Sequence, residues 1–397
     1  MIRLLKYIIF LILVIISTAC IFPYDPEITR YEDVLTIDGL LTDNPEFTLV
    51  SLSRTNQLSM SKSYPYPEQE KNPETGATVF IQDNMGNTST FYEASPGEYR
   101  SDNPGFRGIV GMSYQLFVIT KNEQRYESDF VTLINVPEID TVYAEFGSNP
   151  GEVGMEEGFH IYVDTYDPMN YTHFYRFDFE ETWEFTVPYP SRYYIFDGEL
   201  VPRNEDLGRC WRTVQSTDIM IISNEKLESS VIQRFPIHFV SLETNRLGIR
   251  YSILVKQYSL SREAYAFWDQ LKKSSQDRGS LFDSQPVQFT GNVYNVNDPE
   301  SPVIGFFEAA AVAEKRIFLT HDDVPINSRV KNEFQECRHK YYIIPETEMK
   351  PSRFDYYYYC KTDWTSIDPF TRGMGLTWDF DCCDCTRSGS NIKPDFW

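Results

Sequence analysis

Short runs in which apolar and polar residues alternate fill the sequence from residue 31 to residue 136, and turn residues separate them. In the run from Phe47 to Ser53, every second residue falls on one face, and the run 79–81 ends at a hairpin-type turn, Asp83–Asn87. Alternation with a period of two is typical of strands that bury one face. We therefore predict an immunoglobulin-like antiparallel β-sandwich of about seven strands over residues 31–137.

The region from residue 138 to residue 397 is predicted to form a larger, mainly β domain. Val136-Pro137-Glu138-Ile139-Asp140 marks the junction. Gly291 and Gly305 interrupt sequence that is otherwise typical of strands, which indicates bulges or a close approach of two backbones. The candidate strands are residues 159–164, 173–183, 218–223, 234–242 and 250–258.

One segment of this region has helical periodicity. Its apolar residues recur at i, i+3, i+4 and i+7, and they are Ala264, Phe267, Trp268 and Leu271. Ser261 is a good N-cap residue, so we predict a helix near residues 262–275. The apolar stripe is expected to cover an open face of a sheet, and docking of a partner is the alternative.

The first twenty residues have the form of an export signal. Arg3 and Lys6 precede an apolar run from Tyr7 to Ile16, and three small residues lead into Cys20. This run is shorter than the roughly 20 residues that span a bilayer. We predict a lipoprotein signal peptide over residues 1–19, a lipid anchor on Cys20 and a linker to residue 30. An ordinary cleaved signal is the alternative.

The charge of the chain excludes some partners. The formal net charge is −22, whereas nucleic-acid binding needs a basic surface. An acidic chain also lacks the basic patch that holds a protein on anionic lipids, so membrane attachment is assigned to the acyl chains. We expect no nucleic-acid partner, and most of the charge is attributed to solubility.

The cysteines predict disulfide bonds in the second half of the chain. Six cysteines remain beside Cys20, and an even number in an exported chain favours disulfides. Zinc bound by several of them with His339 is the competing interpretation. The disulfide candidates are Cys210, Cys337, Cys360, Cys382, Cys383 and Cys385. We also expect disulfide bonding and burial to hold the terminal Phe396-Trp397.

No known catalytic motif is present in the sequence. The five histidines include no H-E-x-x-H, and there is no G-x-S-x-G elbow, Walker loop or G-x-G-x-x-G. His321-Asp322-Asp323 is the best local acid/base or metal cluster, and a solvated loop is the alternative for it. We predict no catalytic residue and no cofactor.

Two oxygen-rich loops are candidate calcium-binding sites. Neither has the spacing of an EF-hand, and Asx turns explain both equally well. The first contains Asp164, Asp167 and Asn170, and the second contains Asn295, Asn297, Asp298 and Glu300.

A set of short motifs, taken in order, resembles the DUF4249 family of Bacteroidota lipoproteins, a domain of unknown function. Ser17 in place of the usual Leu and the additional Cys383 depart from the pattern. The motifs are Cys20 with Pro23-Tyr24-Asp25-Pro26-Glu27, Ile37–Thr42, Leu52–Thr55, Thr182–Phe185, Cys210-Trp211, Ser261–Trp268, Gly279–Asp283, Gly291-Asn292, Gly305–Phe307 and the ending in Cys-Asp-Cys and Lys-Pro-Asp-Phe-Trp.

The resemblance implies an outer-membrane lipoprotein, often encoded near TonB-dependent receptors of the SusC type, with no established enzyme activity. Asp25 and Glu27, which follow Cys20, resemble the surface-export signal of this phylum, so a cell-surface location is expected.

Together these observations predict a non-enzymatic outer-membrane lipoprotein. It would be an accessory or binding subunit of a SusC-like TonB-dependent transporter complex, anchored to the membrane by its N-terminal lipid. Two other classes stay open: a surface hydrolase of glycans or peptides, and an adhesion or envelope-structural protein. The row Tyr356–Tyr359 would suit a glycan platform or an adhesion surface, or pack in the core.

Overall fold

The computed structural model describes eleven segments of the chain, and its regular structure is mainly β, as predicted. One α-helix, α2 (Arg262–Gln276), lies in them, at the position expected from the apolar stripe. The described residues are 34–55, 72–151, 154–191, 193–196, 199–225, 230–276, 291–334, 337, 340–345, 373–376 and 380–397.

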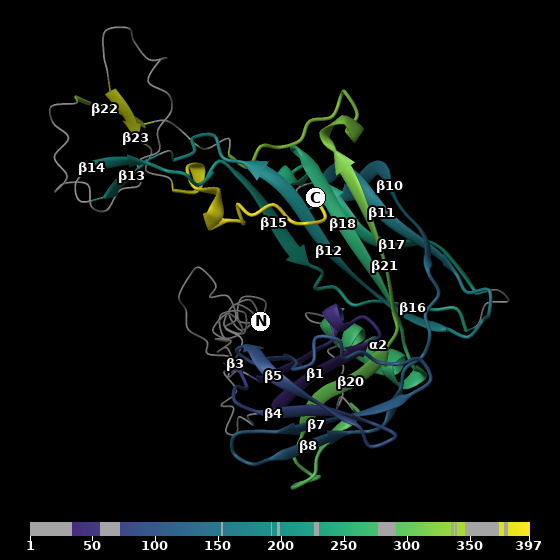
Figure 1. Cartoon of the computed structure of the whole chain (residues 1–397). Coiled ribbons are helices and arrows are strands. Elements are labelled where there is room, and N and C mark those ends of the chain that lie inside the picture. Colours follow the sequence, from purple (N-terminus) through teal and green to yellow (C-terminus); the bar gives the residue numbers. More distant parts are fainter. Residues whose placement is uncertain are drawn as a thin grey trace, which may run out of the picture.

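The first unit is one 11-stranded sheet, the lower part of Figure 1. Its strand order is β19-β8-β7-β4-β5-β6-β2-β1-β20, with β3 beside β2 and β9 beside β7. The strands are β1 (Leu35–Thr42), β2 (Leu49–Arg54), β3 (Asn72–Pro73), β4 (Thr78–Asp83), β5 (Thr88–Ser95), β6 (Glu98–Ser101), β7 (Ser113–Ile119), β8 (Arg125–Ser128), β9 (Val131–Thr132), β19 (Val293–Asn295) and β20 (Val303–Ala310).

This sheet curls until its two ends nearly meet, so it resembles a barrel. The side chain of Asn292, next to β19, accepts a hydrogen bond from the Phe307 amide at 2.7 Å and donates one to the Phe307 carbonyl at 2.8 Å. A Cβ on Gly291 would collide with the Gly305 carbonyl, which confirms the predicted close backbone approach at these glycines. The immunoglobulin-like sandwich is not confirmed, because the strands form a single sheet.

Two strands from late in the chain complete the first sheet. Residues of β20 pair in parallel with β1, in the register Leu35↔Val303 to Thr42↔Ala310. β19 pairs antiparallel with β8. The chain therefore leaves the first unit near Val136 and returns to it after α2, so residues 138–397 do not all lie in the second unit. A boundary read along the sequence cannot detect such a return.

The alternating pattern buries one face of each strand inside the first sheet. In β1, Leu35, Ile37 and Leu41 are buried, and they pack with Leu116 of β7 and Phe307 of β20. Burying an aliphatic or aromatic side chain contributes roughly 1.5–3 kcal/mol. The interior of the curled sheet is thus the first hydrophobic core.

The second unit, the upper part of Figure 1, is a sandwich of two sheets that enclose the largest core. The 3-stranded sheet has the order β10-β11-β17, and the 5-stranded sheet has the order β15-β12-β18-β21 with β16 beside β12. All five predicted strand segments of this region coincide with observed strands. The strands are β10 (Ile139–Pro150), β11 (Met155–Tyr166), β17 (Val231–Ser241), β12 (Phe174–Thr186), β15 (Arg209–Gln215), β16 (Met220–Ser223), β18 (Arg250–Ser259) and β21 (Val312–Thr320).

Short elements complete the described chain. They are the hairpins β13 (Tyr193–Phe196) with β14 (Glu199–Pro202) and β22 (Lys340–Pro345) with β23 (Gly373–Leu376), and the 3-10 helices η1 (Pro45–Phe47), η2 (Asn245–Leu247), η3 (His321–Asp323), η6 (Phe380–Cys382) and η7 (Cys385–Arg387).

Helix α2 lies where the two units meet (Figure 1). Its Ala264 and Phe267 are buried, and Phe267 stacks on Phe306 of β20 at 5.0 Å between ring centroids. Phe174 of β12 belongs to the same cluster. The stripe therefore covers the protein's own strands, and the alternative of an exposed docking helix is wrong.

Candidate functional site

The best candidate site is a hollow on the outer face of the β5–β6 hairpin. Tyr92 and Arg100 face each other across these strands, and both are exposed. The hollow has a volume of about 580 Å³, within the range of ligand pockets. We call it the hairpin hollow; its lining includes Asn44, Glu46, Tyr92, Arg100, Asn103 and Phe106.

The walls of the hairpin hollow are two rigid turns. On one side, Asn44 caps η1, and its side chain accepts a hydrogen bond from the Glu46 amide at 3.2 Å. Arg100 Nη1 donates to the Glu46 carbonyl at 3.2 Å, which connects this wall to the floor. On the other side, Asn103 Oδ1 accepts from the Gly105 amide at 3.0 Å. The local turns hold the walls without occupying the space between them.

A smaller hollow adjoins the first. It has a volume of about 280 Å³ and shares Asp102, Asn103 and Phe106 with the hairpin hollow. We call it the turn hollow, since its far wall is the β4–β5 turn with Asp83 and Asn87. The two hollows are neighbours that share these three lining residues, and we call them together the paired hollows.

Charges in the paired hollows are mainly negative. Asp102 accepts a hydrogen bond from Thr90 Oγ1 at 2.6 Å, and Glu46 and Asp83 add two more carboxylates against the single guanidinium of Arg100. A hydrogen bond from the Asn87 side chain, together with weaker effects of backbone N–H donors in the same turn, holds the pKa of Asp83 below its usual value. The site is thus acidic at neutral pH.

Sequence reasoning did not find this site. Thr90 and Tyr92 on β5 and Arg100 on β6 alternate with core residues, and Asp102 follows directly after β6. This alternation is a detectable signal for an outward polar and aromatic face. The signal lacked a ligand motif, and η1 is brought beside the hairpin only by the pairing of β2 with β6.

The cluster His321-Asp322-Asp323 forms the single exposed turn of the 3-10 helix η3. Asp323 Oδ2 accepts hydrogen bonds from the Thr320 amide at 2.7 Å and hydroxyl at 2.9 Å, a capping box at the start of η3. All three residues are exposed. The cluster thus has the geometry of the solvated loop that was its alternative.

Both candidate calcium loops are turns that side chains stabilise through hydrogen bonds. Asp167 accepts hydrogen bonds from three backbone amides, those of Met169, Tyr171 and Thr172, at 2.8–2.9 Å. In the second loop, Asn295 Oδ1 accepts from the amides of residues 297 and 298. Among the described residues, no group of three His, Cys, Asp or Glu side chains is arranged to hold a metal.

The cysteines form disulfides, as predicted. Cys210 bonds to Cys385, Cys337 bonds to Cys382, and Cys383 is also disulfide-bonded. The adjacent residues Cys382 and Cys383 therefore have different partners. Cys360 lies outside the described residues, as do His339 of the zinc alternative and the row Tyr356–Tyr359.

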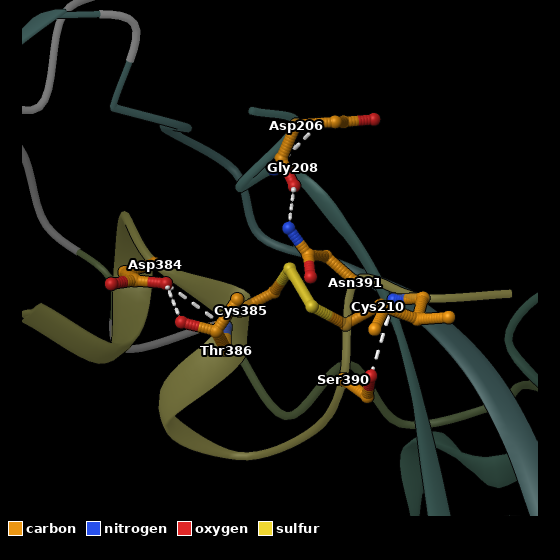
Figure 2. Close-up of a disulfide and its surroundings, with 9 residues drawn as sticks. Asp206, Gly208, Cys210, Asp384, Cys385, Thr386, Ser390 and Asn391 are labelled. Atoms are coloured by element: carbon orange, nitrogen blue, oxygen red, sulfur yellow. Dashed lines mark hydrogen bonds between the residues drawn. A yellow bond between two sulfur atoms is a disulfide. The ribbon is translucent and has the colours of Figure 1, made fainter. Parts of the chain in front are cut away.

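The Cys210–Cys385 bond attaches the C-terminal segment to the edge of the sandwich (Figure 2). Ser390 exchanges two backbone hydrogen bonds of 2.8 Å with Trp211, and Asn391 Nδ2 donates to the Asp206 carbonyl at 3.2 Å. The segment continues across the 5-stranded sheet, where Trp397 Nε1 donates to Glu184 at 3.2 Å. The disulfide and the hydrogen bonds hold the C-terminal segment, as predicted, but the predicted burial is only partial, because Phe396 is 39% exposed.

The predicted lipidation site and export signal, Cys20, Asp25 and Glu27, lie outside the described residues. In the described part of the chain, no helix has the length and apolar character needed to cross a membrane.

A buried ionic cluster joins the two units. Arg176 of β12 contacts Asp178 at 3.1 Å and Glu308 of β20 at 3.2 Å, and its guanidinium lies between the rings of Tyr258 and Trp268. Trp268 Nε1 also donates to Glu308 at 2.9 Å. Burial raises the pKa of Glu308 despite the positive charge of Arg176. These side chains bind one another between the two units, which is the geometry of a structural contact.

Comparisons with known proteins agree with the sequence resemblance. A family model described as "Domain of unknown function (DUF4249)" matches residues 21–316. No curated protein matches the chain. One solved structure, described as "Biofilm associated protein - BSP domain", is similar at 8% identity with a TM-score of 0.12; the match covers 74% of this chain and 62% of that chain. A TM-score this low supports no argument about fold or function.

Proposed function

Because this chain belongs to the DUF4249 family of domains of unknown function, we propose its function from its own structure: it is a non-enzymatic binding subunit. The observation that carries this proposal is the pair of adjoining hollows, which present exposed polar and aromatic side chains on a rigid β scaffold. Binding residues commonly lie on such loops and faces, held in position by a sheet.

The surroundings of the histidines also support binding rather than catalysis. His160 packs against the ring of Phe239, His238 lies beside the buried Glu181, and His173 lies 3.4 Å from Asn224. None of these three lines the paired hollows, which contain carboxylates and hydroxyls but no histidine or cysteine. A hydrolase at this site would have to use a pair of these carboxylates, one as the acid and the other as the base or nucleophile.

The proposed location is the cell-surface face of the outer membrane. The N-terminal pattern with Cys20 supports a lipid anchor, and Asp25 and Glu27 support surface export. In this arrangement the protein is an accessory subunit beside a SusC-like TonB-dependent transporter. The tether raises the effective concentration of the subunit at the membrane, so that a weak contact with the barrel suffices.

The test is purification of the tagged, lipidated protein from its native envelope in mild detergent, followed by mass spectrometry. Stoichiometric recovery of a TonB-dependent barrel is expected. Cys20→Ala is the matched control: it should leave the membrane fraction and lose the barrel while retaining its fold. Recovery of the wild-type protein alone would contradict the accessory role, and Cys20→Ala remaining in the membrane would contradict the anchor.

A further inference from the structure

We propose that the paired hollows bind a neutral glycan. This inference rests on the binding function proposed above and specifies the chemical class of its ligand. It is argued from the ring of Tyr92, from the hydrogen-bonding groups around it, from the charge of the site and from the pairing of the strands beneath it.

Tyr92 provides a stacking surface. Its side chain is 52% exposed, and among the described residues it has no hydrogen-bond or ring partner. Arg100, opposite on β6, is directed to the Glu46 carbonyl. A pyranose ring presents C–H bonds on its faces, and these pack against an aromatic ring that is apolar on its face and polar at its tip.

The groups around Tyr92 include both donors and acceptors. Asn44 and Asn103 use only their side-chain oxygens in the local turns, so that their amide N–H groups are available to a ligand. Asp102 uses one oxygen to accept from Thr90, which leaves the other as an acceptor. Each sugar hydroxyl donates one hydrogen bond and accepts others, so this mixture matches the edge of a sugar ring.

The charge of the site selects against acidic sugars. The lining has three carboxylates, those of Asp83, Asp102 and Glu46, and one cation, the guanidinium of Arg100. The pKa of Asp83 is lowered, so this carboxylate is ionised at neutral pH. A uronic acid or a sulfated sugar would bring a further negative charge close to these carboxylates. Neutral hexoses, pentoses and N-acetylated hexosamines meet no such repulsion.

The strands beneath the site disfavour an extended peptide. A peptide that joins a sheet gains main-chain hydrogen bonds from an unpaired edge strand. β5 is paired with β4 over Thr88–Phe91 and with β6 over Phe91–Ser95, and β6 is paired with β2 through Glu98 and Tyr99. Much of the backbone beneath the site is therefore already paired, which favours a ligand recognised mainly through side chains and its own hydroxyls.

The test is binding of the full chain to an array of neutral hexose, pentose and N-acetylhexosamine oligomers, uronic-acid polymers and unstructured peptides, followed by calorimetry with the best oligomer. Binding to a neutral oligomer is expected, at least tenfold weaker in Tyr92→Ala and in Asn103→Ala. Tyr294→Ala is the matched control, because Tyr294 is 43% exposed on β19 of the same sheet but lines neither hollow.

Three outcomes would overturn the glycan inference: no binding to any neutral oligomer, binding that Tyr92→Ala leaves intact, or binding of uronic-acid polymers or peptides that requires Tyr92. If the protein still purifies with a transporter barrel, the accessory function stands without this ligand class. If neutral oligomers bind and no barrel is recovered, the ligand class stands and the transporter partnership fails.

Discussion

Strand β12 carries two buried charged clusters, one on each face, and they differ in composition. On the inner face, Glu181 is a single carboxylate surrounded by donors: Arg246 at 3.0 Å, the hydroxyl of Tyr251 at 3.0 Å and His238 at 3.4 Å. On the outer face, Arg176 is a single cation whose charge acts on three carboxylates, those of Asp178, Glu308 and the more solvent-accessible Asp38.

The difference sets opposite pKa directions. Burial alone would raise the pKa of Glu181, but His238, Arg246 and Tyr251 together hold it below its usual value. For Glu308, burial dominates over Arg176 and raises the pKa. The inner cluster thus has enough donors for its charge, whereas the outer cluster has more negative charge than one guanidinium can balance. A buried charge stabilises the fold only when its partners compensate for desolvation.

The substitution Glu181→Gln should have the largest effect. It removes the carboxylate that accepts from Arg246 and Tyr251 inside the sandwich core. Removing one partner of a buried pair costs roughly 3–5 kcal/mol. Urea unfolding at pH 7 measures this loss, and Glu180→Gln on the same strand, where Glu180 is more accessible, is the control. If Glu181→Gln lowers the free energy of unfolding by less than Glu180→Gln does, the partners of Glu181 do not compensate for its burial.

Arg176→Met should destabilise the protein by about 3 kcal/mol at pH 7, because it leaves Glu308 and Asp178 without their cation. The loss should be smaller at pH 5, where Glu308, whose pKa is raised by burial, is closer to protonation. Glu181→Gln should show no such recovery between these pH values, since the lowered pKa keeps Glu181 ionised. If Arg176→Met loses the same stability at both pH values, the proposed difference between the inner and outer clusters is contradicted.

Deletion of Phe396 and Trp397 examines the far end of the outer face of β12. Trp397 donates to Glu184, and the guanidinium of Arg316 lies over the ring of Phe396. Because both rings are only partly buried, we expect a loss of about 2 kcal/mol, within the range for aromatic burial. Thermal unfolding measures it, with Ile392→Ala, at a 76% exposed position, as the control. An unchanged melting temperature would mean that these contacts contribute nothing.

Glu308→Gln should have the smallest effect at pH 7, within about 1 kcal/mol, because Arg176 keeps Asp178 as its ion-pair partner and the lost charge is one that burial disfavours. The raised pKa means that folded protein holds this proton more tightly than the unfolded chain. Its contribution to stability therefore rises as pH falls through the folded pKa and is complete below the unfolded pKa. Urea unfolding from pH 7 to pH 5 should show a smaller gain in Glu308→Gln than in wild type.

The sequence predicted a strand over residues 173–183 but not what covers its two faces. Its aromatic residues alternate with Arg176, Asp178 and Glu180, the usual pattern of a strand with one face in solvent. In the structure, the outer face is also covered, by β20 and α2 at one end and by Trp397 at the other. The alternation of apolar and polar residues shows how polar each face of a strand is. A charged face can still be buried when another segment supplies ion-pair or hydrogen-bond partners for it.

The helix was predictable in more detail than the site. The stripe from Ala264 to Leu271 repeats within a few residues, so its period can be read locally, and its burial on Phe306 confirmed the expected role. The paired hollows need three segments at once: η1, the β5–β6 hairpin and the β4–β5 turn. Each segment alone is an ordinary polar turn or strand, so the sequence could indicate an outward polar and aromatic face on the hairpin but not the site that the three segments form.

By itself, the sequence determined the mainly β character, the position of the helix and the use of cysteines in disulfides, because period and composition act over short distances. Tertiary structure decided that β20 lies beside β1 and closes the first sheet, and that Cys210 bonds to Cys385. These contacts join residues that are far apart along the chain; the cysteines alone are separated by 175 positions. Such pairings depend on which distant faces fit together, and no local pattern encodes that choice.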